Sequence, residues 1–234
     1  MRRILASALI TLLTILLSGC FTGGYAPVVQ VGTTPQKAPA YYRVQQGDTL
    51  YSIAWSYGLD YRQLAHLNHL SRSYQIWPGQ RLALKQRVSS HRQMAGKKSS
   101  NFLQKEFTYN RGTVMHWGWP VKGNIIQGFK PGYSGNAGLD ISGYYGETIL
   151  ATAPGVVVYS GDGVRGYGNL IIIKHSDDYL SAYAFNKRNL VRVGSRVVKG
   201  QQIATMGRNN EGKAALHFEI RQNGKPVNPM HYLG

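Results

Sequence analysis

The sequence predicts an α+β protein of two domains, a small βααβ module followed by a mainly antiparallel β domain. Three observations lead to this prediction. Between residues 41 and 85, a short alternating run is followed by apolar residues at helical spacing. From residue 116 onward, β-branched runs are separated by glycine turns, with no convincing long helix. The segments 20–40 and 86–115 have the composition of linkers.

The chain begins with an export signal, which we assign to residues 1–19. Two arginines follow the first methionine, and residues 4–17 form an apolar run too short to span a bilayer comfortably. The run ends in Leu17-Ser18-Gly19-Cys20, which resembles the lipobox of bacterial lipoproteins, in which the cysteine is acylated and becomes the first residue. The alternative is a signal anchor with an incidental cysteine. Because Cys20 is the only cysteine, no intrachain disulfide can form.

Lipidation determines the expected location. Several acyl chains on Cys20 would hold the chain stably to a bilayer. Phe21 rather than Asp follows the cysteine, which among similar lipoproteins implies the outer membrane. We therefore expect an outer-membrane lipoprotein that faces the periplasm.

The charge balance indicates acidic surroundings. A formal net charge of +17 would suit binding to nucleic acid. Because an exported protein does not encounter nucleic acid, we expect no nucleic-acid partner. Anionic envelope polymers and acidic lipid headgroups are more available. Residues 20–40 form a lipidated tether, and residues 86–115 a basic flexible linker. That basic run is either solvated or in contact with an anionic polymer.

The first module, residues 41–85, is predicted as a βααβ unit. Residues 42–44 alternate like a strand, and residues 81–84 form the closing strand after a turn at 77–80. Asp48 or Thr49 can cap the first helix. The apolar face of this helix has i, i+3, i+4, i+7 spacing: Leu50, Ile53, Ala54 and Tyr57.

Both ends of this module, residues 42–50 and 76–82, resemble the LysM domain. The resemblance implies binding of glycans that contain N-acetylglucosamine, hence of peptidoglycan strands, in a shallow groove between two loops. The implied glycan-binding residues are Gly47, Asp48, Thr49, Leu50, Tyr74, Gln75 and Ile76. Backbone amides, short polar groups and an apolar floor suit such a ligand.

Other residues of the module leave alternatives open. Tyr51, Trp55 and Trp77 could stack on sugars, although aromatic residues at helical spacing favour the core. His66 and His69 lie three positions apart and could hold a metal, but a solvated surface is favoured.

The second domain, residues 116–234, is predicted as an antiparallel sheet or a small barrel. Its expected strands are residues 155–160, 169–175, 180–184, 202–206 and 217–221. The motifs Gly166-Tyr167-Gly168-Asn169, Ser181-Ala182-Tyr183-Ala184 and His217-Phe218-Glu219-Ile220-Arg221 resemble the LytM-type, lysostaphin-like M23 peptidases.

The resemblance also implies that the catalyst has been lost. Active members bind zinc through His-x-x-x-Asp and the second His of a His-x-His pair, and two further histidines assist catalysis. This chain has Asn136, Phe185 and Ala215 where histidines are expected, and only Asp140 and His217 match. A hydrolytic zinc centre needs three protein ligands and an open water position. We therefore expect no enzyme activity, no cofactor, and only remnant ligand positions at Asn136, Asp140 and His217.

A LysM module followed by a degenerate LytM domain on a lipoprotein resembles the NlpD-type murein hydrolase activators. The resemblance implies a periplasmic N-acetylmuramoyl-L-alanine amidase as partner, cell-wall hydrolysis and daughter-cell separation. The expected partner-binding residues are Asn136, Tyr167, Phe185, His217 and Arg221. Strand alternation places Arg221 on the same face as His217, where it could meet an acidic residue of the partner. For Tyr167 and Arg221, fold stabilisation is the alternative.

Two other functions remain open at this stage. The chain could be a peptidoglycan-binding tether without an activating role. It could also be a zinc endopeptidase whose ligands have been rearranged. The candidates for such a rescue are His116, His175 and His231, of which His175 is expected to be structural.

Overall fold

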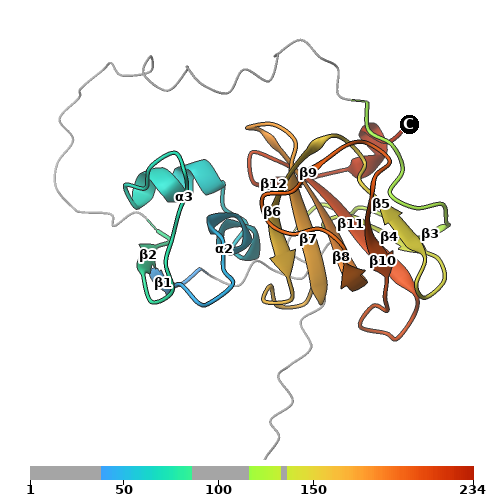
Figure 1. The fold of residues 1–234 in the computed structure, drawn as a ribbon, viewed down its shortest axis with the longest axis horizontal. Helices are drawn as coiled ribbons and strands as arrows, with labels where there is room; N and C mark the ends of the chain where they lie inside the picture. Colours follow the sequence, from blue (N-terminus) through green and yellow to red (C-terminus); the bar gives the residue numbers. More distant parts are fainter. Residues whose placement is uncertain (1–37, 86–115, 133–135) are drawn as a thin grey trace, which may run out of the picture.

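The computed structural model describes residues 38–85, 116–132 and 136–234. It contains an N-terminal module (residues 38–85) and a C-terminal domain (residues 116–234), shown in Figure 1. The predicted α+β class, with a mainly antiparallel β domain, is confirmed. Cys20 and the linker 86–115 lie outside the described residues. In the described part of the chain, no helix is long and apolar enough to cross a membrane.

The N-terminal module has the predicted βααβ order. Its elements are β1 (Tyr41–Arg43), α2 (Leu50–Ser56), α3 (Tyr61–Leu67) and β2 (Arg81–Ala83). Strands β1 and β2 pair antiparallel. Of the two cap candidates, Thr49 caps α2 through a capping box with Ser52. Asp48 instead accepts hydrogen bonds from the Tyr42 hydroxyl and the Gln45 amide, and so closes the turn before the helix.

The C-terminal domain is one twisted antiparallel sheet with short additional strands. Its strands are β3 (Ile125–Gln127), β4 (Leu139–Ser142), β5 (Thr148–Leu150), β6 (Gly155–Gly161), β7 (Asn169–Lys174), β8 (Tyr179–Asn189), β9 (Arg196–Val197), β10 (Gln202–Met206), β11 (Ala215–Gln222) and β12 (Lys225–Val227). The main order is β3-β4-β11-β8-β7-β6-β9, while β10 pairs with β5 and β8, and β12 with β11. A 3-10 helix, η1 (Pro229–His231), lies near the end of the chain.

Apolar side chains cover both faces of the central strands. On β7, Ile171 and Ile173 enter the core of the C-terminal domain, whereas Leu170 and Ile172 point to the opposite face. That opposite face joins the apolar residues of the N-terminal module in a single cluster. Helix α2 accordingly lies beside β6 in Figure 1. The N-terminal module therefore packs on the C-terminal sheet.

Candidate functional site

We call the five positions at which the family resemblance implies zinc ligands or catalytic histidines the remnant site. They are Asn136, Asp140, Phe185, Ala215 and His217, and the last four come together in space. Strand pairing brings them together, because His217 on β11 lies opposite Asp140 on β4 and opposite Ala184 on β8. Phe185 follows Ala184 directly. The two halves that the sequence separates by 77 positions are thus joined by antiparallel register.

The imidazole of His217 lies between two carboxylates. Its Nδ1 is 2.5 Å from Asp140 Oδ1, and its Nε2 is 3.0 Å from Glu219 Oε1. The side chain is 1% exposed. Burial lowers the pKa of His217, but the hydrogen bonds to Asp140 and Glu219 outweigh it and raise the pKa to about 9. Both ring nitrogens are therefore engaged by carboxylates of the chain itself.

Glu219 connects this pair to two further side chains, and we call Tyr167, His217, Glu219 and Arg221 the Glu219 network. The Tyr167 hydroxyl donates to Glu219 Oε1 at 2.7 Å, and Arg221 Nε donates to Oε2 at 2.9 Å. Burial raises the pKa of Glu219, but the Arg221 charge and the His217 hydrogen bond outweigh it and lower the pKa to about 2. Burial together with the Glu219 charge raises the pKa of Tyr167.

Alternation along β11 explains the network, since His217, Glu219 and Arg221 share one face, while Phe218 and Ile220 enter the core behind it. Strand alternation predicts this shared face, but the expected site residues did not include Glu219. The sequence could have indicated Glu219, because a glutamate between a histidine and an arginine on one strand face can form hydrogen bonds with both.

The remnant site does not fit zinc. The side-chain amide of Asn136 donates to the carbonyls of Gly138, at 3.0 Å, and Gly128, at 3.3 Å. Phe185 and Ala215 carry no donor atom. Together with the engaged imidazole of His217, this leaves fewer than the three ligands that a catalytic zinc requires. Within residues 38–85, 116–132 and 136–234, no group of three metal-binding side chains is assembled.

Phe185 retains an unusual backbone at the position of a lost catalytic histidine. Its φ is +62°, in the left-handed region that costs a bulky residue on the order of 1–3 kcal/mol. Two backbone hydrogen bonds hold it there, from its amide to the Tyr167 carbonyl and from the Gly207 amide to its carbonyl. The ring centroids of Phe185 and His217 are 6.2 Å apart. The left-handed backbone of Phe185 is thus fixed by its neighbours, and its side chain offers no group that could accept a proton.

The expected partner-binding residues are buried in the structure, although the sequence led us to expect them to contact a partner. Their exposed fractions are Asn136 2%, Tyr167 9%, Phe185 7%, His217 1% and Arg221 5%. Arg221 is engaged within the chain, where its Nε donates to Glu219. Its Nη1 donates to the Trp55 carbonyl at 2.8 Å, and its guanidinium carbon lies 3.6 Å from the centroid of a Trp55 ring. The physical reason is that a buried guanidinium needs acceptors, and α2 supplies one.

The expected glycan-binding loops lie at one end of the N-terminal module. Gly47 and Gln75 are exposed, Asp48, Thr49, Tyr74 and Ile76 are half-buried, and Leu50 is buried in the module core. The ring of Tyr74 packs edge-on against the rings of Tyr51 and Tyr61. The loops can therefore offer backbone groups and an aromatic floor.

The aromatic residues of the module divide between the two alternatives. Trp55 is 3% exposed and belongs to the core, as favoured, but Trp77 is 63% exposed, so the core assignment is wrong for Trp77. Its turn, residues 77–80, projects the indole into solvent because Val44 and Gln80 hold only the backbone. His66 and His69 are both exposed, as expected.

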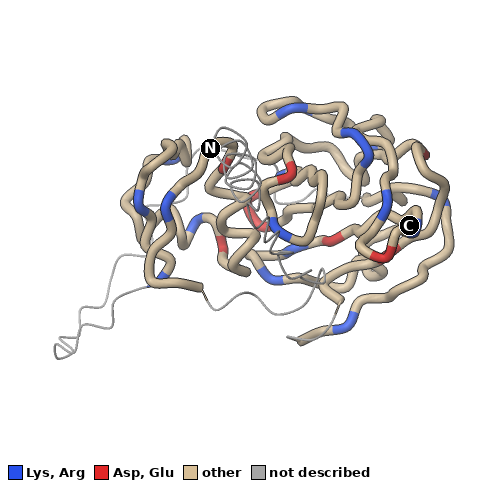
Figure 2. Tube along the Cα trace, turned by 90° about the horizontal axis from the view of Figure 1, so that it is seen from below, with Lys and Arg blue, Asp and Glu red and all other residues tan. Residues whose placement is uncertain are grey.

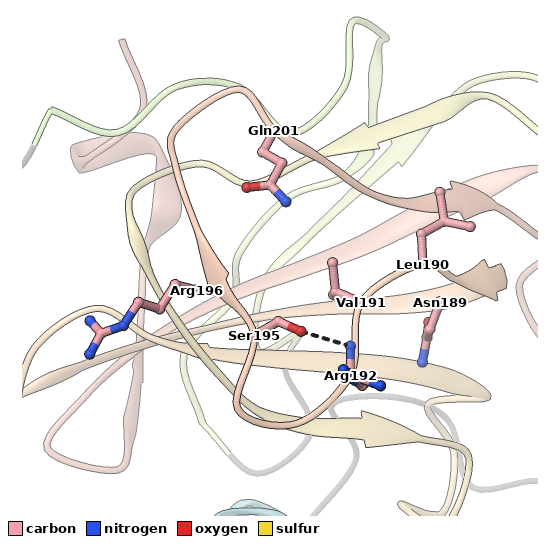
Figure 3. A pocket seen from close by; sticks show the side chains of 7 residues that line it. All are labelled: Asn189, Leu190, Val191, Arg192, Ser195, Arg196 and Gln201. Atoms are coloured by element: carbon pink, nitrogen blue, oxygen red, sulfur yellow. Dashed lines mark hydrogen bonds between the residues drawn. The ribbon is translucent and has the colours of Figure 1, made fainter.

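A pocket on the C-terminal domain shares no residue with the remnant site (Figure 3). It is lined by Asn189, Leu190, Val191, Arg192, Ser195, Arg196 and Gln201. Among these side chains there is no carboxylate, histidine or cysteine, so the lining offers no acid–base pair. Lysines and arginines are spread along both parts of the chain and exceed the acidic residues (Figure 2), in keeping with the net charge of +17.

Comparisons with known proteins identify two families, one in the N-terminal module and one in the C-terminal domain. Residues 42–85 match the LysM domain, and residues 134–229 match Peptidase family M23. The chain is 36% identical to the lipoprotein NlpD/LppB homolog of Pseudomonas aeruginosa, over 93% of this chain and 88% of that protein. It is 36% identical to the murein hydrolase activator NlpD of Escherichia coli (82% of this chain, 67% of that protein) and 40% identical to the uncharacterized lipoprotein YgeR of the same organism (82% and 80%).

Among solved structures, the chain is similar to a zinc containing peptidase from Vibrio cholerae, with 28% identity and a TM-score of 0.46. That match covers 49% of this chain and 39% of the peptidase.

Proposed function

Because the chain belongs to the NlpD family of lipoproteins, we propose that it is a non-catalytic envelope protein that binds peptidoglycan and activates an N-acetylmuramoyl-L-alanine amidase. The observation that carries the proposal is the remnant site. A peptidase-like fold keeps two of five functional positions, and an amide, a phenyl ring and a methyl group occupy the others. A peptidase-like scaffold with this content suits binding better than hydrolysis, and relatives of the chain are named murein hydrolase activators.

Activation of this kind is a shift between two states of the partner. The C-terminal domain must bind the open amidase more tightly than the plugged one, because equal affinity for both would shift nothing. Moving an amidase from 1% to 99% open requires a difference of about 10⁴-fold in affinity. Tyr167 and Arg221 are the side chains we propose to contact the regulatory segment of the amidase, next to Asn136, Phe185 and His217.

The N-terminal module would hold this activity at its substrate. The loops at Gly47–Leu50 and Tyr74–Ile76 are the proposed glycan contacts. Acylation of Cys20 would fix the chain to the outer membrane, on its periplasmic side. Two attachments on one chain raise the local concentration of activator at the wall without any new contact to the amidase. Promotion of daughter-cell separation is the expected consequence.

Dye release from labelled peptidoglycan sacculi tests the proposal. Residues 21–234, which lack the acylated cysteine, are added alone and with each amidase of the host, and a zinc-stripped amidase serves as control. Release only in mixtures with an active amidase is the expected result. Release by the chain alone would mean a zinc endopeptidase. Sacculus binding without release in any mixture would leave a peptidoglycan tether.

A further inference from the structure

The N-terminal module covers the surface that the proposed function requires to be free. In one apolar cluster, Leu50, Ile53 and Trp55 of α2 join Val158 and Leu170 of the C-terminal sheet. These five side chains are at most 9% exposed. Removal of this apolar surface from water stabilises the docked position of the module.

Trp55 is the side chain that covers the Glu219 network. Its carbonyl accepts from Arg221 Nη1, and its ring lies over the guanidinium. A cation–π contact of this kind is strongest when it is desolvated, as here. Arg221 Nη2 also donates to the Tyr167 hydroxyl at 3.2 Å. Of the two residues proposed to touch the amidase, Arg221 is therefore bonded to α2, and Tyr167 is bonded to Arg221.

Polar contacts fix the orientation of the module around this centre. Arg62 Nη1 lies 2.9 Å from Asp178 Oδ1, and Nη2 donates to Asn223 Oδ1 at 2.6 Å. The Tyr61 hydroxyl donates to the carbonyl of Asp177 at 3.2 Å. These bonds join α3 to the turns at the ends of β7 and β11. The docked position therefore has a specific polar rim around an apolar centre, as protein interfaces do.

Gly224 shows how closely the two parts approach. A Cβ built on Gly224 would lie 2.7 Å from the backbone oxygen of Leu59 and 2.7 Å from the backbone nitrogen of Asp60. Its φ of +78° also suits glycine. A side chain at this turn would force the module away from the sheet.

From these contacts we infer that the N-terminal module is an intramolecular inhibitor of the C-terminal domain: in a closed state, α2 occupies the amidase-binding surface and must leave before the amidase can bind. The inference rests on the proposed function of the C-terminal domain. A tethered module competes at an effective concentration on the order of 1 mM. The 30 residues from 86 to 115 can span up to about 100 Å, so the module can leave without separating from the chain.

The closed state also indicates the chemistry of the competing ligand. To replace α2, a segment of the amidase must cover an apolar strip, place an aromatic ring over Arg221 and offer a carbonyl oxygen to Nη1. An amphipathic helix with an exposed aromatic side chain meets these demands.

A double variant of residues 21–234, Arg62→Cys with Asp178→Cys, tests the inference in both directions. It lacks the rim ion pair and contains no other cysteine, since Cys20 is removed. One portion is joined with a short bismaleimide, which locks the module in place. The other portion is capped with N-ethylmaleimide, which leaves it free to open. Both are titrated into the dye-release assay with an active amidase.

We expect the capped form to stimulate at a concentration several-fold lower than the wild-type chain, and the locked form not to stimulate, although it still binds sacculi. A single variant, Asp178→Arg, should reproduce the gain by repelling Arg62, on the order of threefold to tenfold. Glu211→Arg makes the same charge change at an exposed site elsewhere and should leave the titration unchanged.

The outcomes separate the two proposals. Stimulation by the locked form equal to that by the capped form would overturn the inhibitory role and leave the proposed function standing. Absence of stimulation by every form, including the capped form and Asp178→Arg, would overturn the proposed function and the inhibitory role with it. Stimulation by the capped form at a lower concentration than by the wild-type chain, together with a silent locked form, would support both.

Discussion

Glu219→Gln removes the one charge that the Glu219 network shares. The carboxylate accepts hydrogen bonds from Tyr167, His217 and Arg221, and its side chain is fully buried. Its pKa falls from 4.5 to about 2, which corresponds to about 3 kcal/mol of stabilisation of the ionised form. Removal of one partner of a buried ion pair typically costs about 3–5 kcal/mol. Since glutamine can still accept one bond, we expect a loss of about 3 kcal/mol.

Calorimetric unfolding of residues 21–234 measures this loss. For a domain of this size, 3 kcal/mol corresponds to a decrease of about 10 °C in the Tm of the C-terminal transition. Glu211→Gln is the matched control, because Glu211 pairs with Lys213 at the exposed surface and its loss should leave the Tm unchanged. An unchanged Tm for Glu219→Gln would refute the argument that the network holds a buried charge by specific pairing.

Four further predictions address other parts of the chain. Burial lowers the pKa of His175 from 6.5 to about 4, so its contribution is complete above pH 6.5 and is lost as the pH falls toward 4, by up to about 3 kcal/mol; urea unfolding at pH 7 and 4.5 should show a smaller difference in His175→Gln than in the wild-type chain. Thr49→Ala removes the cap of α2 and should cost about 1 kcal/mol in the same assay, and an unchanged midpoint would exclude the capping box as a stabilising feature. Trp77→Ala should leave the Tm unchanged but weaken sacculus binding about threefold to tenfold if the exposed indole stacks on sugars, and equal binding would assign Trp77 no glycan contact. Isothermal titration of metal-free protein with zinc should show no stoichiometric binding, and a one-to-one site would contradict the geometry of the remnant site.

Most of the fold could be predicted from short-range patterns of apolar residues in the sequence. The helical spacing from Leu50 to Tyr57 and the alternation from His217 to Arg221 are short-range signals, and both elements occur where these signals lie. The end of β8 was missed. The predicted strand stopped at Ala184, whereas β8 continues through Phe185 to Asn189 despite the left-handed backbone of Phe185. A tertiary pairing with β10 extends that strand, and no local pattern encodes it.

The remnant site was predictable in content but not in its surroundings. The family motifs identified Asp140 and His217, and pairing of β4 with β11 was enough to bring them together. The contact between Trp55 and Arg221 joins positions 166 apart in the chain. Each residue had an ordinary local explanation, Trp55 as module core and Arg221 as a charged strand residue, and only the packing of one part on the other brings them into contact.

The cover of the Glu219 network by α2 has an electrostatic basis. In a zinc centre of this family, the charge of the metal would offset that of its ligands. Here the formal charges of Asp140 and Glu219 are balanced by the imidazolium of His217 and the guanidinium of Arg221, at distances between 2.5 and 3.0 Å. Because the cluster is neutral as a whole and its donors and acceptors are paired, an apolar helix can lie over it without leaving an uncompensated charge.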